Sequence, residues 1–319
     1  MLRTTIALTA LMLAPALASA DSITVYSAGP ASLAEALQDA FEAETGIEVD
    51  LFQGTTGDVM ARLEAEESNP QADVVISASW ASALDLHDRG LLMEYTSPNA
   101  ETVPDFLKHS HYVAQAVSAL AIAWNTESGT PRPSDWGDLA DDDYTDLVTM
   151  PDPSQSGSAF ELVAGLQETM GEDAWTLFGD LADNGMIVPG ANAAALNPVL
   201  QGAAAAVFGA VDYISYGRAE SGESIEVITP ESGTVIAPRP MMILGSTDAP
   251  ESAQAFIDFV LSEAGQELVA EVFLMPSRTD VEARRPGLNE LDIIELDPEE
   301  LDAQRTEILE RYNEVVLGR

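Results

Sequence analysis

The sequence predicts an α/β protein of two lobes, each a mixed, mostly parallel sheet flanked by helices, with two strands crossing between the lobes. Three observations support this fold class. Strand and helix patterns alternate from the start of the mature chain to about residue 80, a second alternating segment begins near residue 144, and two long apolar stretches separate the segments. Alternation of this kind is typical of parallel sheets with right-handed crossovers.

The first lobe begins with "SITVYSAG", a β-branched and aromatic strand that ends at Ser27, Ala28 and Gly29. Pro30 then opens a helix. "GIEVDLFQGTTGD" predicts a second strand, a turn and a second helix, and "ADVVISAS" predicts a buried strand with Trp80 just beyond its end. The order is therefore β-α-β-α-β.

The long apolar stretch "YVAQAVSALAIAWNT" predicts a buried strand that crosses to the second lobe. "YTDLVTM" begins the second α/β unit, and "IEVITPESGTVIAPRPMMIL" can return the chain to the first lobe. Between them we expect helices near 158–170, 172–184 and 194–205, a strand at "GMIVPG", and a strand in "AAAAVFGAVDY" before a turn. A helical pair and a final helix at about 299–316 complete the chain. The predicted boundaries are a signal peptide at 1–20, a first lobe at 21–118 plus 237–319, and a second lobe at 119–236.

The first twenty residues have the pattern of a cleaved secretory signal. Arg3 is followed by the apolar run "TIALTALMLAPALA" and by the small residues Ala18-Ser19-Ala20. The chain has no cysteine, so it has neither a disulfide nor the acceptor residue of a bacterial lipoprotein. We expect export to the periplasm of a Gram-negative cell without a lipid anchor.

The chain is strongly acidic. It has 54 acidic and 13 basic residues, and its formal net charge is −41. Such a surface makes nucleic acids and anionic membranes poor partners. Scattered acidic residues with almost no lysine are typical of adaptation to a saline environment, so a single Asp or Glu is interpreted first as a solvated surface group. We expect a monomer.

Two turns have the composition of anion-binding helix starts. In "SQSGSAF", Ser156, Gly157 and Ser158 precede a helical pattern, and "QGTTGD" places Thr55 and Thr56 in a similar turn. The first turn of a helix carries unpaired N–H donors and a partial positive charge, which suit an oxyanion. The alternative is that each turn is only a helix cap.

A resemblance to a known family follows from these segments and their order. "ITVYSAG", "FEAETGIEVDLFQGTTGDVMARLEAE", "ADVVISASWASALDLHDRGLL", "MPDPSQSGSAFELV", "SAQAFIDFVLSEAGQELVAE" and "MPSRTDV" together resemble a type II periplasmic solute-binding protein of an ABC importer. The similarity is to the branch that holds ferric-iron, sugar-phosphate and aminophosphonate-binding proteins. It implies two lobes that close on a ligand in the cleft, and a membrane permease as partner.

Within this family, the iron-binding members hold Fe³⁺ with a His, a Glu, two adjacent Tyr and a bound anion. Here Pro30 stands in the place of the His and Ala78 in the place of the Glu, and the tyrosine pair falls on Asp212 and Tyr213 with Tyr216 nearby. Ferric iron as cargo, held by Asp212, Tyr213 and Tyr216, therefore remains an alternative with a thin ligand set. The anion turn of the family is present as "SQSGSAF", so the resemblance favours a phosphorylated or phosphonate-type organic anion.

The scarce arginines add to this prediction. Arg239 lies between two prolines at the return crossing, where an ordinary strand position is disfavoured, and Arg278 lies in "MPSRTDV". Each could pair with an anion or with one of the many carboxylates. The predicted ligand-contacting residues are Ser27, Ala28, Thr55, Thr56, Ser77, Trp80, Ser156, Gly157, Ser158, Asn192, Asp212, Tyr213, Arg239 and Arg278.

We expect a binding protein rather than an enzyme, with a periplasmic hydrolase as the alternative of a different class. The sequence has no Gly-x-Ser-x-Gly elbow, phosphate-loop lysine or His-Glu-x-x-His motif. His109 and His111 have strand spacing and could pair as metal ligands, but the sequence offers no evident third ligand. His87, beside Asp88, is interpreted as a surface residue.

Overall fold

A computed structural model describes residues 22–319, apart from the side chains of Pro298, Glu299 and Asp302. The predicted signal peptide lies outside the described residues. The fold class is confirmed, because strands and helices form a mixed α/β architecture with the two long predicted strands between its halves. In the described part of the chain, no helix combines the length and the apolar character needed to cross a membrane.

The strands alternate with helices along most of the chain. They are β1 (Ser22–Ser27), β2 (Glu48–Gln53), β3 (Val74–Ile76), β4 (Tyr112–Asn125), β5 (Val148–Thr149), β6 (Ala206–Val211), β7 (Ile225–Ile228), β8 (Ile236–Ile243) and β9 (Met275–Pro276). The α-helices are α1 (Ala31–Thr45), α2 (Thr56–Ala65), α3 (Trp80–Asp88), α4 (Gly157–Met170), α5 (Glu172–Asp183), α6 (Asn192–Leu200), α7 (Asp212–Glu220), α8 (Pro250–Val260), α9 (Glu263–Glu271) and α10 (Pro298–Leu317).

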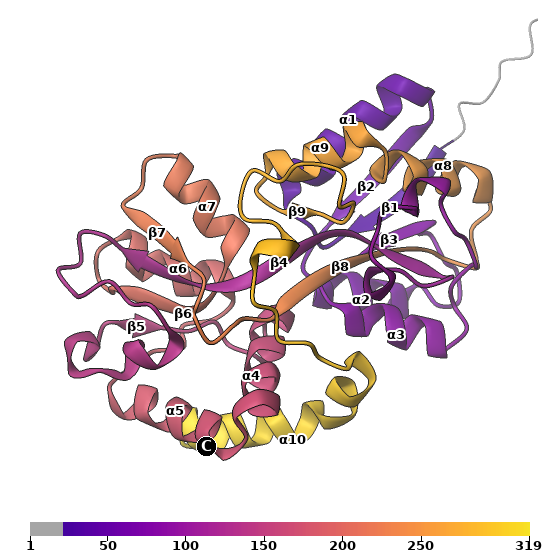
Figure 1. Cartoon of the computed structure of the whole chain (residues 1–319). Helices are drawn as coiled ribbons and strands as arrows, with labels where there is room; N and C mark the ends of the chain where they lie inside the picture. The colour runs from indigo at the N-terminus through magenta and orange to yellow at the C-terminus, as the bar shows by residue number, and fades with distance from the viewer. Residues whose placement is uncertain (1–21) are drawn as a thin grey trace, which may run out of the picture.

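The sheet has the order β2-β1-β3-β8-β4-β6-β5, with β7 and β9 also paired to β4. The outer pairs β1–β2, β1–β3 and β5–β6 are parallel, whereas β8 runs antiparallel to β3 and β4. The first half of β4 pairs with β8, and its second half, from Leu120 to Asn125, pairs with β6 and β7. The buried strand β4 thus runs through both halves of the molecule, as Figure 1 shows.

Two large buried clusters accompany this arrangement. One gathers side chains of β1, β3, α1, α3, α8 and the first half of β4, and the other gathers side chains of β6, α4, α5 and the second half of β4. In Figure 1 the corresponding elements form two bodies, and β4 and β8 run between them. The division into two lobes at residues 118 and 237 remains a prediction, which this distribution of apolar side chains supports.

The C-terminal helix packs where the sequence analysis did not place it. The sequence predicts the segment up to residue 319 as part of the first lobe, but Ile294, Ile308 and Tyr312 are buried in the second cluster. The Tyr312 ring contacts Phe178 of α5, and α10 lies along α5 in Figure 1. The other end of α10 contacts α3 of the first body.

Two local predictions differ from the structure. Asp212 to Glu220 form the helix α7 rather than a turn, and "GMIVPG" contributes only an isolated bridge between Ile187 and Thr149 instead of a strand. The first segment directly follows the short strand β6 in the chain, and the second lies beside the short strand β5. In such short stretches the pairing of the backbone, which depends on the tertiary fold, outweighs the local pattern.

Candidate functional site

Several predicted contact residues lie where β1 and β3 end. These strands are parallel, so their carboxyl ends meet at one edge of the sheet, the usual ligand-binding edge of α/β proteins. The Ala28 N–H donates to Ile76 O at 2.8 Å, and the Gly54 N–H donates to Ser27 O at 3.1 Å. The backbone after β1 is therefore fixed against the two neighbouring loops.

The helices α3 and α4 begin against each other at this edge. A Cβ atom built at Gly157 would lie 3.4 Å from Cβ of Ser79, the residue that precedes α3. A side chain at this position would be in van der Waals contact with Ser79, so the residues at the two helix starts are direct neighbours. The two helix starts, one from each body, thus bring their free N–H groups and positive dipole ends close together.

The turn before α4 is held by a small polar network. Ser156 is buried, and its Oγ accepts a hydrogen bond from the Ala159 N–H at 3.2 Å, as expected of a helix cap. The same oxygen donates to Asn192 Oδ1 at 2.8 Å and lies 3.1 Å from Oγ of Ser158. Ser156, Ser158 and Asn192 are therefore brought together, and Ser156 caps α4, whereas its contact with a ligand stays a prediction.

Arg239 is the buried cation of this region. Its side chain extends from β8 and donates from Nη2 to Ala28 O at 2.7 Å, while its Nε is buried without a hydrogen-bond partner. The guanidinium carbon lies 5.8 Å from the centre of the Tyr213 ring. Among residues 22–319 Arg239 forms no salt bridge within 4.0 Å, and burial lowers the pKa of its guanidinium. A buried, incompletely paired arginine is a strong position for an anion.

Glu161 is the carboxyl group that could oppose Arg239, but its environment keeps it neutral. Burial raises the pKa of Glu161 to about 8, and the Arg305 and Arg239 guanidinium groups only partly oppose this rise. Its Oε2 is buried without a partner. Glu161 also lines a hollow of about 490 Å³ with Trp80, Glu295 and other residues. At neutral pH the protonated Glu161 leaves the charge of Arg239 uncompensated.

The variant Glu161→Gln is expected to become more stable than the natural chain as the pH rises. The folded-state pKa of about 8 exceeds the unfolded value of 4.5, so the natural chain loses stability from about pH 4.5 up to about pH 8. Glutamine has no proton to lose, and the gain in unfolding free energy at pH 7 should be on the order of 2–3 kcal/mol. Urea unfolding across this pH range measures it.

Glu168→Gln on the exposed side of α4 is the matched control and should show no such gain. A Glu161→Gln variant whose stability runs parallel to that of the natural chain from pH 5 to pH 8 would contradict the raised pKa.

Asp212 is buried and its carboxylate is already fully engaged. Its Oδ2 accepts from the Ala119 N–H at 2.8 Å, its Oδ1 accepts from the Tyr213 N–H at 2.7 Å, and it forms a buried ion pair with Arg285. Burial raises the pKa of Asp212, and the Arg285 guanidinium opposes the rise. The contact of Asp212 with a ligand stays a prediction, and the contacts within the protein make its carboxylate a poor acceptor for one.

The same contacts bear on ferric iron as cargo. The Tyr216 ring lies 5.0 Å from the Arg285 guanidinium carbon and stacks on Phe273, and burial raises the pKa of its hydroxyl. A ferric site needs deprotonated phenols and free carboxylate oxygens. Because Asp212 is paired with Arg285, the set of Asp212, Tyr213 and Tyr216 stays a thin ligand set for ferric iron, which remains the alternative cargo.

The first-body threonines have mixed roles. Thr55 forms a capping box with Asp58, in which its Oγ1 accepts from the Asp58 N–H at 3.1 Å and donates to the Asp58 carboxylate at 2.7 Å. The carboxylate of Asp58 disfavours an anion at this helix start, against the prediction. Thr56 Oγ1 instead accepts from the Ala78 N–H at 3.3 Å and so ties α2 to the loop after β3.

Three further predicted residues are structural in their contacts. Ser77 is buried and accepts from the Ser79 N–H at 3.1 Å. The Trp80 ring packs edge-on against Tyr112 at 5.2 Å between ring centres. Arg278 pairs with the carboxylate of Asp280 through Nε and Nη2, which favours the salt-bridge alternative, and its contact with a ligand stays a prediction.

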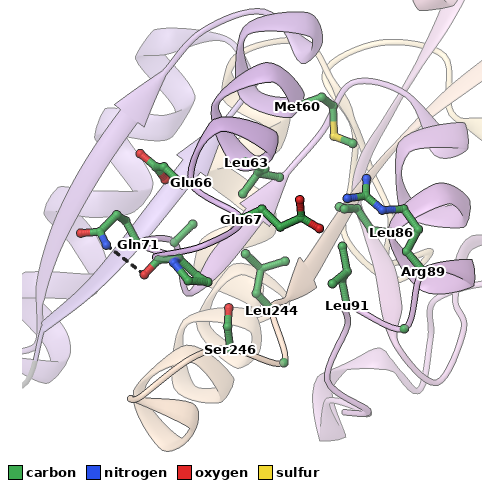
Figure 2. Close-up of a pocket in the computed structure, with 14 residues that line it drawn as sticks. Met60, Leu63, Glu66, Glu67, Gln71, Leu86, Arg89, Leu91, Leu244 and Ser246 are labelled. Atoms are coloured by element: carbon green, nitrogen blue, oxygen red, sulfur yellow. Dashed lines mark hydrogen bonds between the residues drawn. The ribbon is translucent and has the colours of Figure 1, made fainter.

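A separate hollow of about 300 Å³ lies at the far ends of α2 and α3 (Figure 2). Leu63, Leu86 and Leu244 form much of its wall, and Glu67 and Arg89 extend toward one another across it. It faces the carboxyl ends of both helices, where the helix dipole is negative. It is therefore unsuited to the predicted anion and lies apart from the helix starts described above.

Sequence reasoning missed Arg285, Glu161 and Ser79. Arg285 stands in the segment "RRP", where nothing in the residue pattern singles it out, although it is buried in a chain with few basic residues. Glu161 was detectable, because it is the single charge in the apolar run "AFELVAGL". Ser79 was hidden, since only the fold shows that it meets Gly157.

Comparison with known proteins places this geometry in context. A family model described as "Bacterial extracellular solute-binding protein" matches residues 69–294. The "Putative 2-aminoethylphosphonate-binding periplasmic protein" of Salmonella typhimurium (strain LT2) is 27% identical over 284 residues, which cover 83% of each chain.

Two solved structures show the same fold. The periplasmic binding protein AfuA from Actinobacillus pleuropneumoniae, with exogenous fructose-6-phosphate bound, has a TM-score of 0.82 and 24% identity, and the match covers 94% of this chain and 99% of that one. Iron-bound HitA from Pseudomonas aeruginosa has a TM-score of 0.80 and 23% identity, over 92% of this chain and 99% of that one.

Proposed function

Because the chain belongs to the family of bacterial extracellular solute-binding proteins, we propose that it captures a small phosphorylated or phosphonate-type organic anion in the periplasm and delivers it to an ABC importer. The observation that carries this proposal is the buried guanidinium of Arg239, which has an unpartnered Nε and no carboxylate partner within the described residues. A phosphoryl or phosphonate oxygen is the acceptor that such a group requires.

The charge distribution around Arg239 supports this choice of ligand. The protonated Glu161 does not neutralise Arg239, and the second buried arginine, Arg285, is balanced by Asp212. The starts of α3 and α4 add two positive dipole ends. A chain with a net charge of −41 thus has a locally positive site, which selects an anion despite the overall field.

The proposed mode of action is closure of the two bodies around the ligand. We place the first lobe at 22–118 plus 237 to about 290, and the second at 119–236 with the C-terminal segment, following the two buried clusters. An anion between Arg239 and the Ser156–Ser158 turn contacts both lobes only when they are closed. The ligand therefore stabilises the closed form by its differential contacts, and a permease can recognise that form.

A binding screen tests the proposal directly. The names of similar proteins suggest 2-aminoethylphosphonate and fructose 6-phosphate as probes, with ferric citrate as the comparison. We expect thermal stabilisation by a phosphorylated or phosphonate probe, stoichiometric uptake without product, and no visible absorption with iron. Stabilisation by ferric citrate alone, with a visible tyrosinate band, would overturn the proposal, as would release of phosphate with turnover.

The variant Ser156→Asp is expected to weaken binding of the active probe by at least about tenfold, because a carboxylate beside the anion repels it. Aspartate is itself a good helix cap, so α4 should persist. Ser262→Asp is the matched control: Ser262 caps α9 in the same way, by accepting from the Gly265 N–H at 3.1 Å, but lies away from the site. Equal affinities of both variants would place the ligand elsewhere.

A further inference from the structure

The three histidines of the chain come together on the surface of the first body. His87 lies near the end of α3, and His109 and His111 lie in the loop before β4. One ring nitrogen of each residue lies within 4.8 Å of the corresponding nitrogens of the other two. The sequence offered no third ligand for His109 and His111, and the fold supplies it as His87. From this geometry we propose that the cluster binds a late first-row divalent transition metal ion, such as Zn²⁺, through three imidazoles.

The backbone that carries two of these rings is well fixed. Lys108 forms a bridge with Val113, and the His109 N–H donates to Tyr112 O at 2.8 Å, which closes a tight loop. The Tyr95 N–H donates to Ser110 O at 2.8 Å from outside the loop. His109 and His111 are thus presented on one rigid hairpin, so a bound metal has little chain entropy to overcome.

Two of the rings have partners that orient them for coordination. Nδ1 of His87 lies 3.5 Å from the Asp88 carboxylate, and Nδ1 of His111 lies 2.9 Å from Oγ of Ser110. In the tautomer that carries its proton on Nδ1, each of these rings has the lone pair of Nε2 free for a metal. A carboxylate or hydroxyl beside a histidine is the usual outer partner of a metal ligand.

The third ring is the accessible one. His109 is exposed, it stacks on Tyr112 at 4.7 Å, and its Nδ1 accepts one long hydrogen bond, 3.3 Å from the His111 N–H. A metal ion that binds this nitrogen therefore has to displace only one weak hydrogen bond. Two nitrogens bound to one tetrahedral zinc lie about 3.3 Å apart. Side-chain rotations that bring the ring nitrogens closer together by roughly 1.5 Å therefore give the spacing that zinc requires.

The ligand set selects the class of metal. Three imidazoles without thiolate suit zinc, nickel or copper, whereas Mg²⁺ and Ca²⁺ prefer oxygen. The acidic hollow lined by Asp141, Asp142, Asp173, Asp180 and Asp183 offers only oxygen ligands and serves as the internal comparison. The histidine cluster lies at the other end of α3 from the proposed anion site, so the metal site is independent of the proposed function.

Titration of the untagged chain with ZnCl₂ in excess Mg²⁺ tests the proposal. The chain has only these three histidines, so its ring signals in a ¹H–¹⁵N spectrum report on the cluster alone. We expect one equivalent of Zn²⁺ to bind above the ordinary histidine pKa of about 6.5, to shift all three ring systems, and to bind about 100-fold more weakly to His87→Asn or His111→Asn.

Asp180→Asn, which removes a carboxylate from the acidic hollow, is the matched control and should retain the Zn²⁺ affinity. Thermal melting without metal establishes that each histidine variant is folded. Zn²⁺ binding that survives His87→Asn, fails in Asp180→Asn or leaves the histidine ring signals unmoved would overturn the proposal.

Discussion

Replacing Arg285 with methionine is expected to lower the free energy of unfolding by about 3–5 kcal/mol, because it strands the buried charge of Asp212. The side chains of both partners are only 1% exposed. Two backbone N–H groups keep Asp212 in place, so the carboxylate cannot escape to water when its cation is removed. Chemical denaturation at neutral pH measures the loss.

Two companion variants separate the buried pair from general effects of the substitution. Arg284→Met removes the neighbouring arginine, whose pair with Glu220 is exposed, and should change stability by less than about 1 kcal/mol. The double variant Arg285→Met with Asp212→Asn leaves no buried charge and should regain much of the loss. A double variant as unstable as the sum of its single changes would contradict the role assigned to this pair.

The variant Arg239→Met is expected to weaken the binding of 2-aminoethylphosphonate or fructose 6-phosphate, whichever the screen identifies, by about 10- to 150-fold. This range corresponds to about 1.5–3 kcal/mol for a hydrogen bond to a charged group. Methionine conserves the apolar length of the side chain but removes the unpartnered Nε and the charge. Isothermal calorimetry gives the affinity.

Arg278→Met is the control for Arg239→Met, because the guanidinium of Arg278 is already paired with the carboxylate of Asp280. It should bind the probe as the natural chain does. Arg239→Lys, which keeps the charge without the planar fork, should recover part of the affinity. If Arg239→Met folds and binds normally, the anion site is not at Arg239.

Much of the fold was predictable because it depends on local patterns. The strand and helix order of the first body and the buried strand from Tyr112 follow from periodicity, and the caps at Thr55 and Ser156 follow from residue type. The predicted turn at Asp212 was wrong, because a helix starts there directly after a strand, without any loop that would separate the two patterns.

The candidate site was predictable only in part. The turn at Ser156 and the proline-flanked Arg239 stand out in the sequence, but the ion pair between Asp212 and Arg285 joins residues far apart in the chain. The same holds for His87 with His109 and His111. Residue types alone cannot indicate which acid a given arginine meets in a chain with 54 acidic residues, since that choice depends on how the elements pack.

The position of α10 has a consequence for the order in which the chain matures. Ile308 and Tyr312 fill the interior built by the middle of the chain, and β8, α8 and α9 complete the interior built by its beginning. Neither half can close its core until late segments have been synthesised. Such long-range dependence slows folding, and a polypeptide that stays open while it is made is in the state that threading through a translocation channel requires.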